Sequence, residues 1–290
     1  MDASSRLALA LARERLDELT RPASGLLGKA RDVLTRQPRV TTDTEMLDLA
    51  GELFAVGRLL EGQPSLRRAL SDPSGKPDDR ADLVDRLFRG KVSGVTLDLL
   101  ETVARQRWSR PSDLVDAMTT LGAEAALDAA DTEGALDDVE DELFRFGRIV
   151  SGNRELSRLL SDRSASVEGT GALIDRLLSG KVSAVTGLLL RNVLTSRRVG
   201  SAEVAVERLS EAASRRRGQS VARVTTAVAL TPAQEQRLTD VLSRLYGRTI
   251  GLQVTVDPDV LGGLIVQVGD EVIDGSVAHR LEAARRRLAG

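Results

Sequence analysis

The residues best suited to chemistry lie near the end of the chain, in the stretch GGLIVQVGDEVIDGSVAHRL at residues 262–281. It holds four glycines, three acidic side chains and a serine. Glycine-rich loops bind phosphate groups, and clustered carboxylates bind metal ions or transfer protons. The stretch is therefore the first candidate for a nucleotide, metal or catalytic site.

The spacing of these residues argues against each of those sites. A dinucleotide fingerprint needs G-x-G-x-x-G and a P-loop ends in Gly-Lys-Ser/Thr, but here the spacing is G-G-x5-G-x5-G and no lysine follows Lys181. Asp270, Glu271 and Asp274 do not match the alternate acids of a calcium loop. The chain has no cysteine and a single histidine, His279, which excludes thiol nucleophiles and histidine clusters. We expect no catalytic residue, no metal site and no cofactor.

The same residues have a structural interpretation. LIVQV alternates as a strand, Gly269 and Asp270 suit a turn that allows positive φ, and EVID suits the returning strand. Gly275 then ends that strand, and Ser276 is placed to cap a last helix, where negative charge is favoured. The expected helix has an apolar seam at Val277, Leu281, Ala284 and Leu288.

The composition limits the class of protein. Of the 290 residues, 41% are hydrophobic and only 2% aromatic, so the chain lacks the aromatic platforms of single-strand nucleic-acid binders. The net charge is −2, without the positive excess of a general DNA binder. No apolar run approaches the roughly 18 residues of a membrane span, and the N-terminus has no signal-peptide pattern. We expect a cytosolic protein that binds no nucleic acid and does not insert into a membrane.

An internal duplication dominates the middle of the chain. Residues 48–110 align with 138–200 at a constant offset of 90, with 27 identities in 63 pairs and no gap. In both copies the apolar residues recur at spacings of three and four, which predicts helices. The clearest stripes in the first copy are at Leu49, Leu53, Val56 and Leu60, at Val84, Leu87 and Phe88, and at Val95, Leu99, Leu100 and Val103.

Further helices are expected around these stripes. The second copy predicts helices near 136–150, 155–161, 172–179 and 182–197. A long helix starting after Pro111 would close the first bundle and open the second. Helices are also expected at 5–20 and 25–37, with a linker at 36–45. Trp108, the only tryptophan, suits a core and an interface equally.

The pattern changes after residue 217. Val224, Val228 and Leu230 alternate as a strand. A helix then starts with Thr231 as N-cap, Pro232 at its first position and Gln234 completing a capping box. Its predicted buried stripe is Leu238, Val241, Leu242 and Leu245, and a further strand is expected at 250–256.

The predicted fold is therefore mainly α, with two tandem duplicated helical bundles followed by a small C-terminal α/β domain. The expected domains are a first bundle at 1–110, a second bundle at 111–217 and the α/β domain at 218–290.

The C-terminal stretch resembles the signature of one family, the delta subunit of bacterial F-type ATP synthase, which includes the mitochondrial oligomycin-sensitivity-conferring protein. The resemblance covers about 113–290, and the first helical copy is an addition to the usual family plan. Enlarged delta subunits of this kind are similar to those of high-GC bacteria. The matching positions are Gly262, Gly263, Val268, Gly269, Asp270, Ile273, Asp274, Gly275, Ser276 and Leu281.

The resemblance implies a non-catalytic stator subunit at the cytoplasmic face of the bacterial cell membrane. In that family the helical bundle binds the N-terminal helices of the alpha subunits, and the C-terminal domain holds the C-terminal end of the b subunit. The second copy is favoured as the head-binding bundle because it is linked to the C-terminal domain. Two other readings stay open from the residues alone: a helical-repeat adaptor of another complex, and an enzyme that uses the C-terminal acids.

Overall fold

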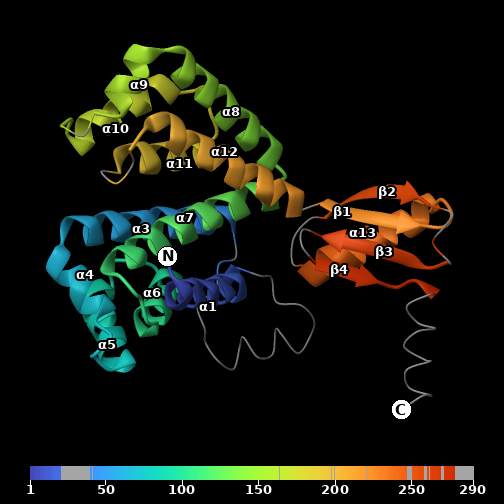
Figure 1. Ribbon diagram of the computed structural model, residues 1–290, viewed down its shortest axis with the longest axis horizontal. Helices are drawn as coiled ribbons and strands as arrows, with labels where there is room; N and C mark the ends of the chain where they lie inside the picture. The colour runs from blue at the N-terminus through green and yellow to red at the C-terminus, as the bar shows by residue number, and fades with distance from the viewer. Residues whose placement is uncertain are drawn as a thin grey trace. The chain divides into compact units, whose positions relative to one another are not determined.

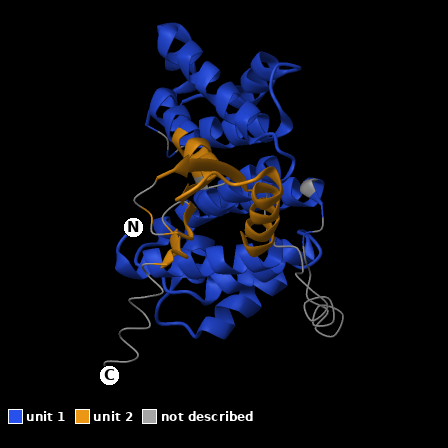
Figure 2. Cartoon of the chain, turned by 90° about the vertical axis from the view of Figure 1, so that its right-hand side faces the viewer, with its two compact units in different colours: residues 1–210 blue, residues 211–290 orange. Residues whose placement is uncertain are grey.

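The computed structural model describes most of the chain, in two compact units, Met1–Ser210 and Glu211–Gly290 (Figure 2). The predicted fold class is confirmed, because helices dominate and a small sheet follows them. No helix in the described part is long and apolar enough to cross a membrane. The described residues are 1–20, 40, 42–162, 164–196, 198, 200–219, 221–246, 250–257, 260, 262–268 and 271–277, without the side chains of Asp43 and Gln219.

The helices of the first unit repeat along the chain (Figure 1). Four of them recur at the predicted offset: α3 with α8, α4 with α9, α5 with α10, and α6 with α11. The elements are α1 (Ala3–Thr20), α3 (Asp43–Gly62), α4 (Pro64–Ser71), α5 (Pro77–Phe88), α6 (Gly94–Arg105), α7 (Pro111–Thr132), α8 (Leu136–Gly152), α9 (Arg154–Leu160), α10 (Val167–Leu178), α11 (Ala184–Thr195) and α12 (Ala202–Gln219).

Local capping signals set most of these boundaries. Thr42 and Glu45 form a capping box that starts α3 at Asp43. The last residues of the predicted linker at 36–45, from 43 onward, therefore belong to the helix. The predicted helix at 25–37 lies outside the described residues. Ser166 caps α10, so the helix starts at Val167, five residues before the predicted start at 172. The apolar stripe alone does not contain this signal.

Helix α7 belongs to both copies, as predicted. It packs against α1, α3 and α4 of the first copy and against α8 and α11 of the second. The packing of α3 on α7 is tight at Gly122, where an added Cβ atom would lie 2.6 Å from the ring of Phe54. A single helix thereby joins the two copies within one unit.

Two of the three predicted apolar stripes of the first copy are fully buried: Leu49, Leu53, Val56 and Leu60 on α3, and the α6 side chains predicted to share one face. In the third, Val84 and Phe88 are buried and Leu87 is half-buried. Trp108 is a core residue, since it is 3% exposed and its Nε1 donates a hydrogen bond to the carbonyl oxygen of Val103 at 3.0 Å.

The second unit contains a four-stranded sheet in the order β2-β1-β3-β4. β1 and β2 run parallel, joined by α13 as a crossover, while β3 is antiparallel to both β1 and β4. The buried core consists of Ala222, Val224, Leu242, Ile250, Val266 and Val268. The elements are β1 (Val221–Thr226), α13 (Pro232–Tyr246), β2 (Gly251–Val256), β3 (Leu264–Val268) and β4 (Glu271–Asp274).

Two predictions for this unit need correction. The first concerns β1, which ends at Thr226, so Val228 lies beyond the strand and is 70% exposed.

The predicted capping box at the start of α13 is confirmed. Thr231 and Gln234 each accept the backbone N–H of the other through their side chains.

The second correction concerns the buried face of α13. Leu242 is buried and Leu238 and Tyr246 pack beside it, a line at i, i+4 and i+8. Val241 and Leu245 are 45% and 61% exposed, so they do not belong to the buried stripe. Only the side chains of Leu238, Leu242 and Tyr246 on α13 pack against the core of the sheet.

Candidate functional site

The glycines of the C-terminal motif bring two separate segments together. Gly262 and Gly263 precede β3 with φ of +74° and +81°, a region that favours glycine. Gly275 follows β4, and its backbone N–H donates to the carbonyl oxygen of Leu264 at 2.9 Å. The N–H of Val277 donates to the carbonyl of Gly262 at 3.0 Å. The motif therefore ties the end of the hairpin to its beginning.

The other described motif residues build the hairpin itself. Val268 is buried in β3, and Ile273 of β4 pairs with Val266 and packs against the core. Ser276 is 3% exposed, and its N–H donates to the Asp274 carboxylate at 2.9 Å. Gly269, Asp270 and Leu281 lie outside the described residues, as do His279 and the predicted seam of the last helix beyond Val277.

The acids near this hairpin take part in structural contacts. The Glu271 carboxylate accepts a hydrogen bond from the Tyr246 hydroxyl at 2.9 Å, and that of Asp274 accepts the bond from Ser276. Within the described part of the chain, no group of three or more His, Cys, Asp or Glu residues is arranged to hold a metal ion. The contacts of the described motif residues therefore stabilise the hairpin, as expected for a structural motif.

Apolar side chains on the second unit remain open to solvent. Val241 and Leu245 project from α13, and Val256 at the end of β2 is 49% exposed. Val272 on β4 is 58% exposed. Contiguous exposed apolar patches mark protein-binding surfaces, and Val241 and Leu245 lie one turn apart on α13.

In the helical unit, each copy contains the same carboxylate contact. Glu52 of α3 accepts hydrogen bonds from the backbone N–H and hydroxyl of Ser93, at 2.9 and 2.8 Å, where Ser93 caps α6. Glu142 of α8 repeats both contacts with Ser183 at the start of α11, each at 2.9 Å. A negative charge at a helix N-terminus is stabilising, so this duplicated acid has a structural role.

One pair of equivalent residues differs sharply between the copies. Phe54 is 2% exposed against α7, whereas Phe144 of α8 is 59% exposed. Ile149 on the same helix is 58% exposed. The second copy thus presents apolar side chains that the alignment of the two copies does not reveal, because both phenylalanines stand in the same ELF sequence.

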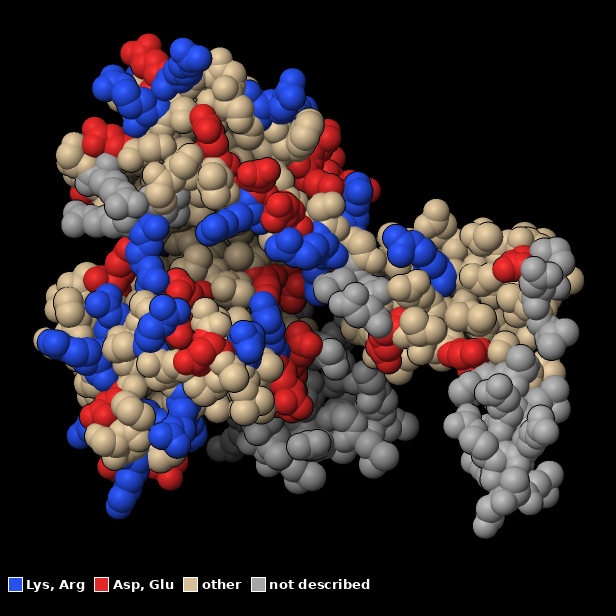
Figure 3. Space-filling model, viewed as in Figure 1, with Lys and Arg blue, Asp and Glu red and all other residues tan. Residues whose placement is uncertain are grey.

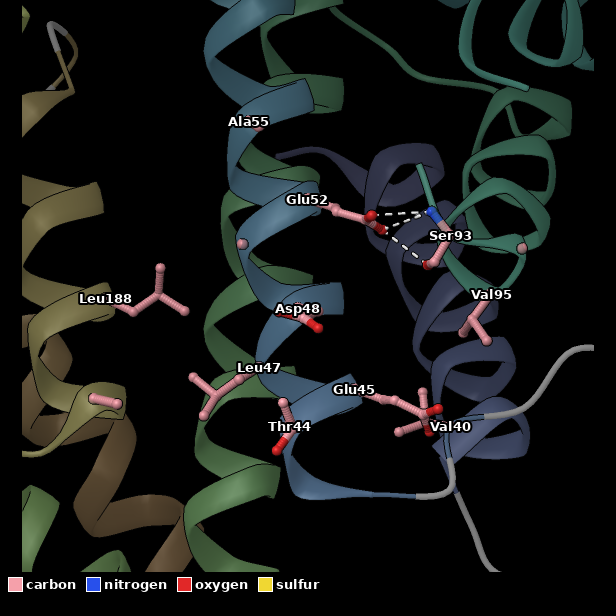
Figure 4. A pocket seen from close by; sticks show the side chains of 13 residues that line it. Val40, Thr44, Glu45, Leu47, Asp48, Glu52, Ala55, Ser93, Val95 and Leu188 are labelled. Atoms are coloured by element: carbon pink, nitrogen blue, oxygen red, sulfur yellow. Dashed lines mark hydrogen bonds between the residues drawn. The ribbon is translucent and has the colours of Figure 1, made fainter. Parts of the chain in front are cut away.

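A groove lies between the two copies within the first unit, and we call it the inter-copy groove. It has a volume of about 930 Å³ and follows the outer face of α3, bordered by the first turns of α6 and α11. Figure 4 shows Leu47 of α3 and Leu188 of α11 pointing toward each other's helix, while Glu52 reaches Ser93 on the other side.

Charges of both signs are interspersed over the visible face of the helical unit (Figure 3). One ion pair joins α7 to the segment after α11, with 2.9 Å between Arg198 Nη2 and an Asp116 carboxylate oxygen. Burial raises the pKa of Asp116 above its ordinary value, and the nearby Arg198 opposes that rise only in part. The exposed apolar side chains on α8 and α13 point to a protein that binds other proteins.

Comparison with known proteins agrees with this class. A family model described as ATP synthase delta (OSCP) subunit matches residues 122–288. "ATP synthase subunit delta" of Streptomyces avermitilis is 47% identical over 286 residues, covering 99% of this chain and 98% of that protein. The protein of the same name from Parafrankia sp. is 43% identical over 288 residues, covering 99% of each. The chain belongs to the ATP synthase delta (OSCP) subunit family.

A solved structure gives a weaker likeness. One chain of the "Cryo-EM structure of Toxoplasma gondii mitochondrial ATP synthase hexamer" is 19% identical, with a TM-score of 0.31. The match covers 58% of this chain and 95% of that one. At this score the likeness carries no structural argument.

Proposed function

We propose that this chain is a non-catalytic stator subunit in the peripheral stalk of a proton-translocating F-type ATP synthase. The observation that carries the proposal is the match to relatives named "ATP synthase subunit delta" over nearly the whole length of both proteins. The stator links the catalytic head to the membrane-anchored stalk, so that the head stays still while the central shaft rotates. The less favoured alternative to a stator subunit is a helical-repeat adaptor protein of another complex.

The helical copies supply the attachment to the head. In this proposal the domains are 1–110, 111–217 and 218–290, and the second of them binds N-terminal helices of the alpha subunits. The exposed apolar side chain of Phe144 supports this assignment. An amphipathic partner helix would bury it through apolar anchors of its own at i, i+3 and i+4.

The α/β domain holds the C-terminal end of the b subunit. Val241 and Leu245 on α13 supply an apolar surface for it, and the glycine motif fixes the hairpin that supports the sheet. The chain has no active site of its own, and its partners hold it at the cytoplasmic face of the bacterial membrane.

Co-purification tests the proposal. An affinity-tagged full-length chain is expected to bring down both alpha and b from detergent-solubilised membranes. Phe144→Asp is expected to lose alpha selectively, and Leu245→Asp to lose b selectively, because each places a charge in a different apolar contact. If the unsubstituted chain retains neither subunit, the stator proposal is wrong and the adaptor alternative gains.

A further inference from the structure

The inter-copy groove is apolar at positions where the other copy is charged. On α3 its floor includes Leu47 and Ala55, while the equivalent residues of α8 are Asp137 and Arg145. On α11 the groove is bordered by Leu188, and the equivalent residue of α6 is Asp98.

In the first copy, Asp98 stands at the position of Leu188 and forms an ion pair with Arg15 of α1 at 2.7 Å. The groove needs residues from both copies, so a chain with one copy could not form it. Its apolar positions therefore come from both copies of the duplicated chain.

The shape of the groove suits a helix. Leu47, Gly51 and Ala55 lie at i, i+4 and i+8 on α3, which forms a straight line along one face. An added Cβ atom at Gly51 would meet no atom within 4 Å, so there is open space above the middle of this line. Neighbouring helices need such room, because their axes approach to about 8–10 Å depending on the side chains between them.

The negative charge of the groove favours a bound helix with basic side chains. Three of its lining residues are acidic, Glu45, Asp48 and Glu52, and none is lysine or arginine. Asp48 is exposed and can face a bound segment. The Glu45 and Glu52 carboxylates accept hydrogen bonds from Thr42 and Ser93 and add their negative charge beside the groove. A complementary segment carries cations beside its apolar face.

We propose that the inter-copy groove binds an amphipathic helix of a partner subunit that carries Lys or Arg beside its apolar face. The inference rests on the proposed function, and it adds an attachment beyond the head-binding and stalk-binding surfaces. Residues 21–39, with five basic side chains and one acidic, and a second copy of this chain are the competing occupants.

Photo-crosslinking in the assembled complex identifies the occupant. A benzophenone side chain in place of the exposed Ala55 is irradiated in ATP synthase purified through a tag on this chain, and the linked peptide is found by mass spectrometry. We expect a partner-subunit segment with basic residues beside an apolar helical face. A crosslink only to residues 21–39 or to another copy of the chain, or no crosslink, overturns the groove proposal alone. If alpha and b are absent from the preparation, the proposed function fails and this inference fails with it.

Two substitutions of similar size at the same position test the charge rule. Binding of the synthetic partner segment to the full-length chain is expected to weaken roughly tenfold or more in Ala55→Arg and much less in Ala55→Glu. Leu47→Asp is expected to weaken it by a similar factor, while Leu159→Asp, at an exposed position of α9 outside the groove, leaves it unchanged. Equal weakening by Arg and Glu at residue 55, or by Asp at residues 47 and 159, contradicts the proposal.

Discussion

Gly263 and Gly275 approach so closely that a Cβ atom on Gly263 would lie 2.5 Å from the carbonyl oxygen of Gly275. The Cα atom of Ser276 would be 2.9 Å away. The two glycines are brought together by the antiparallel pairing of β3 and β4. Their separation in the sequence is thus the length of a hairpin, which explains why it fits no phosphate-binding loop.

We expect Gly263→Ala to destabilise the C-terminal unit by about 2 kcal/mol or more, because it adds a backbone clash to a strained positive φ. Tyr246, the only tyrosine, lies in this unit, and Trp108, the only tryptophan, lies in the helical unit. Urea unfolding followed by each fluorophore separates the two. The Trp108 transition should not move. Gly251→Ala is the control, because an added Cβ there meets nothing within 4 Å.

Gly275→Val tests the link between this hairpin and the stalk. A Cβ atom on Gly275 would lie 3.1 Å from the Leu264 carbonyl oxygen, which already accepts the N–H of Gly275. We expect the branched side chain to open the hairpin and abolish co-purification of b, while alpha is retained and the helical unit stays folded by circular dichroism. Stalk binding at the unsubstituted level would contradict the assignment.

Much of this fold could be predicted from the sequence, because it depends on local signals. The duplication was visible as identities in register, and the start of α13 as the Thr231 capping box. The buried face of α13 was predicted less well. The spacing of Leu238, Val241, Leu242 and Leu245 fits a stripe, but packing on the sheet buries Leu242, partly buries Leu238 and leaves the other two exposed. Periodicity alone does not determine which side of a helix meets its neighbours.

The duplicated carboxylates predict equal effects in the two copies. Removing Glu52 or Glu142 takes away the acceptor for the N-terminal groups of α6 or α11. We expect Glu52→Ala and Glu142→Ala each to lower the free energy of unfolding by about 1 kcal/mol, measured by urea denaturation. The Gln variants should recover part of the loss, since an amide oxygen still accepts. A large effect in only one copy would mean that the contact is not equivalent.

The paired phenylalanines predict opposite effects. Phe54→Ala empties a buried site beside α7, which costs about 3–5 kcal/mol. Phe144→Ala removes an exposed ring and should change stability by no more than about 0.5 kcal/mol. In pull-down experiments we expect the opposite ranking of the two substitutions: Phe144→Ala weakens capture of alpha more than Phe54→Ala does. Comparable stability losses would show that Phe144 is buried in solution.

The exposure of Phe144 could not be predicted from the aligned copies, because Gly122, which leaves room for the Phe54 ring, lies outside the alignment. The inter-copy groove does leave a signal in the alignment, since charged residues of one copy are replaced by apolar ones at Ala55 and Leu188. Differences between the copies were more informative about binding surfaces than their identities.

Asp116 predicts a dependence of stability on pH. Burial raises its pKa in the folded state, so the folded chain holds this proton more tightly than the unfolded chain. The resulting stabilisation is complete below the unfolded pKa of about 4 and is lost as pH rises through the higher folded pKa. In thermal unfolding, Tm of the unsubstituted chain minus Tm of Asp116→Asn should therefore decrease between pH 3.5 and pH 6. Arg198→Gln removes the opposing cation and should steepen the decrease. A difference that grows with pH would mean that the ion pair with Arg198, rather than burial, dominates at this site.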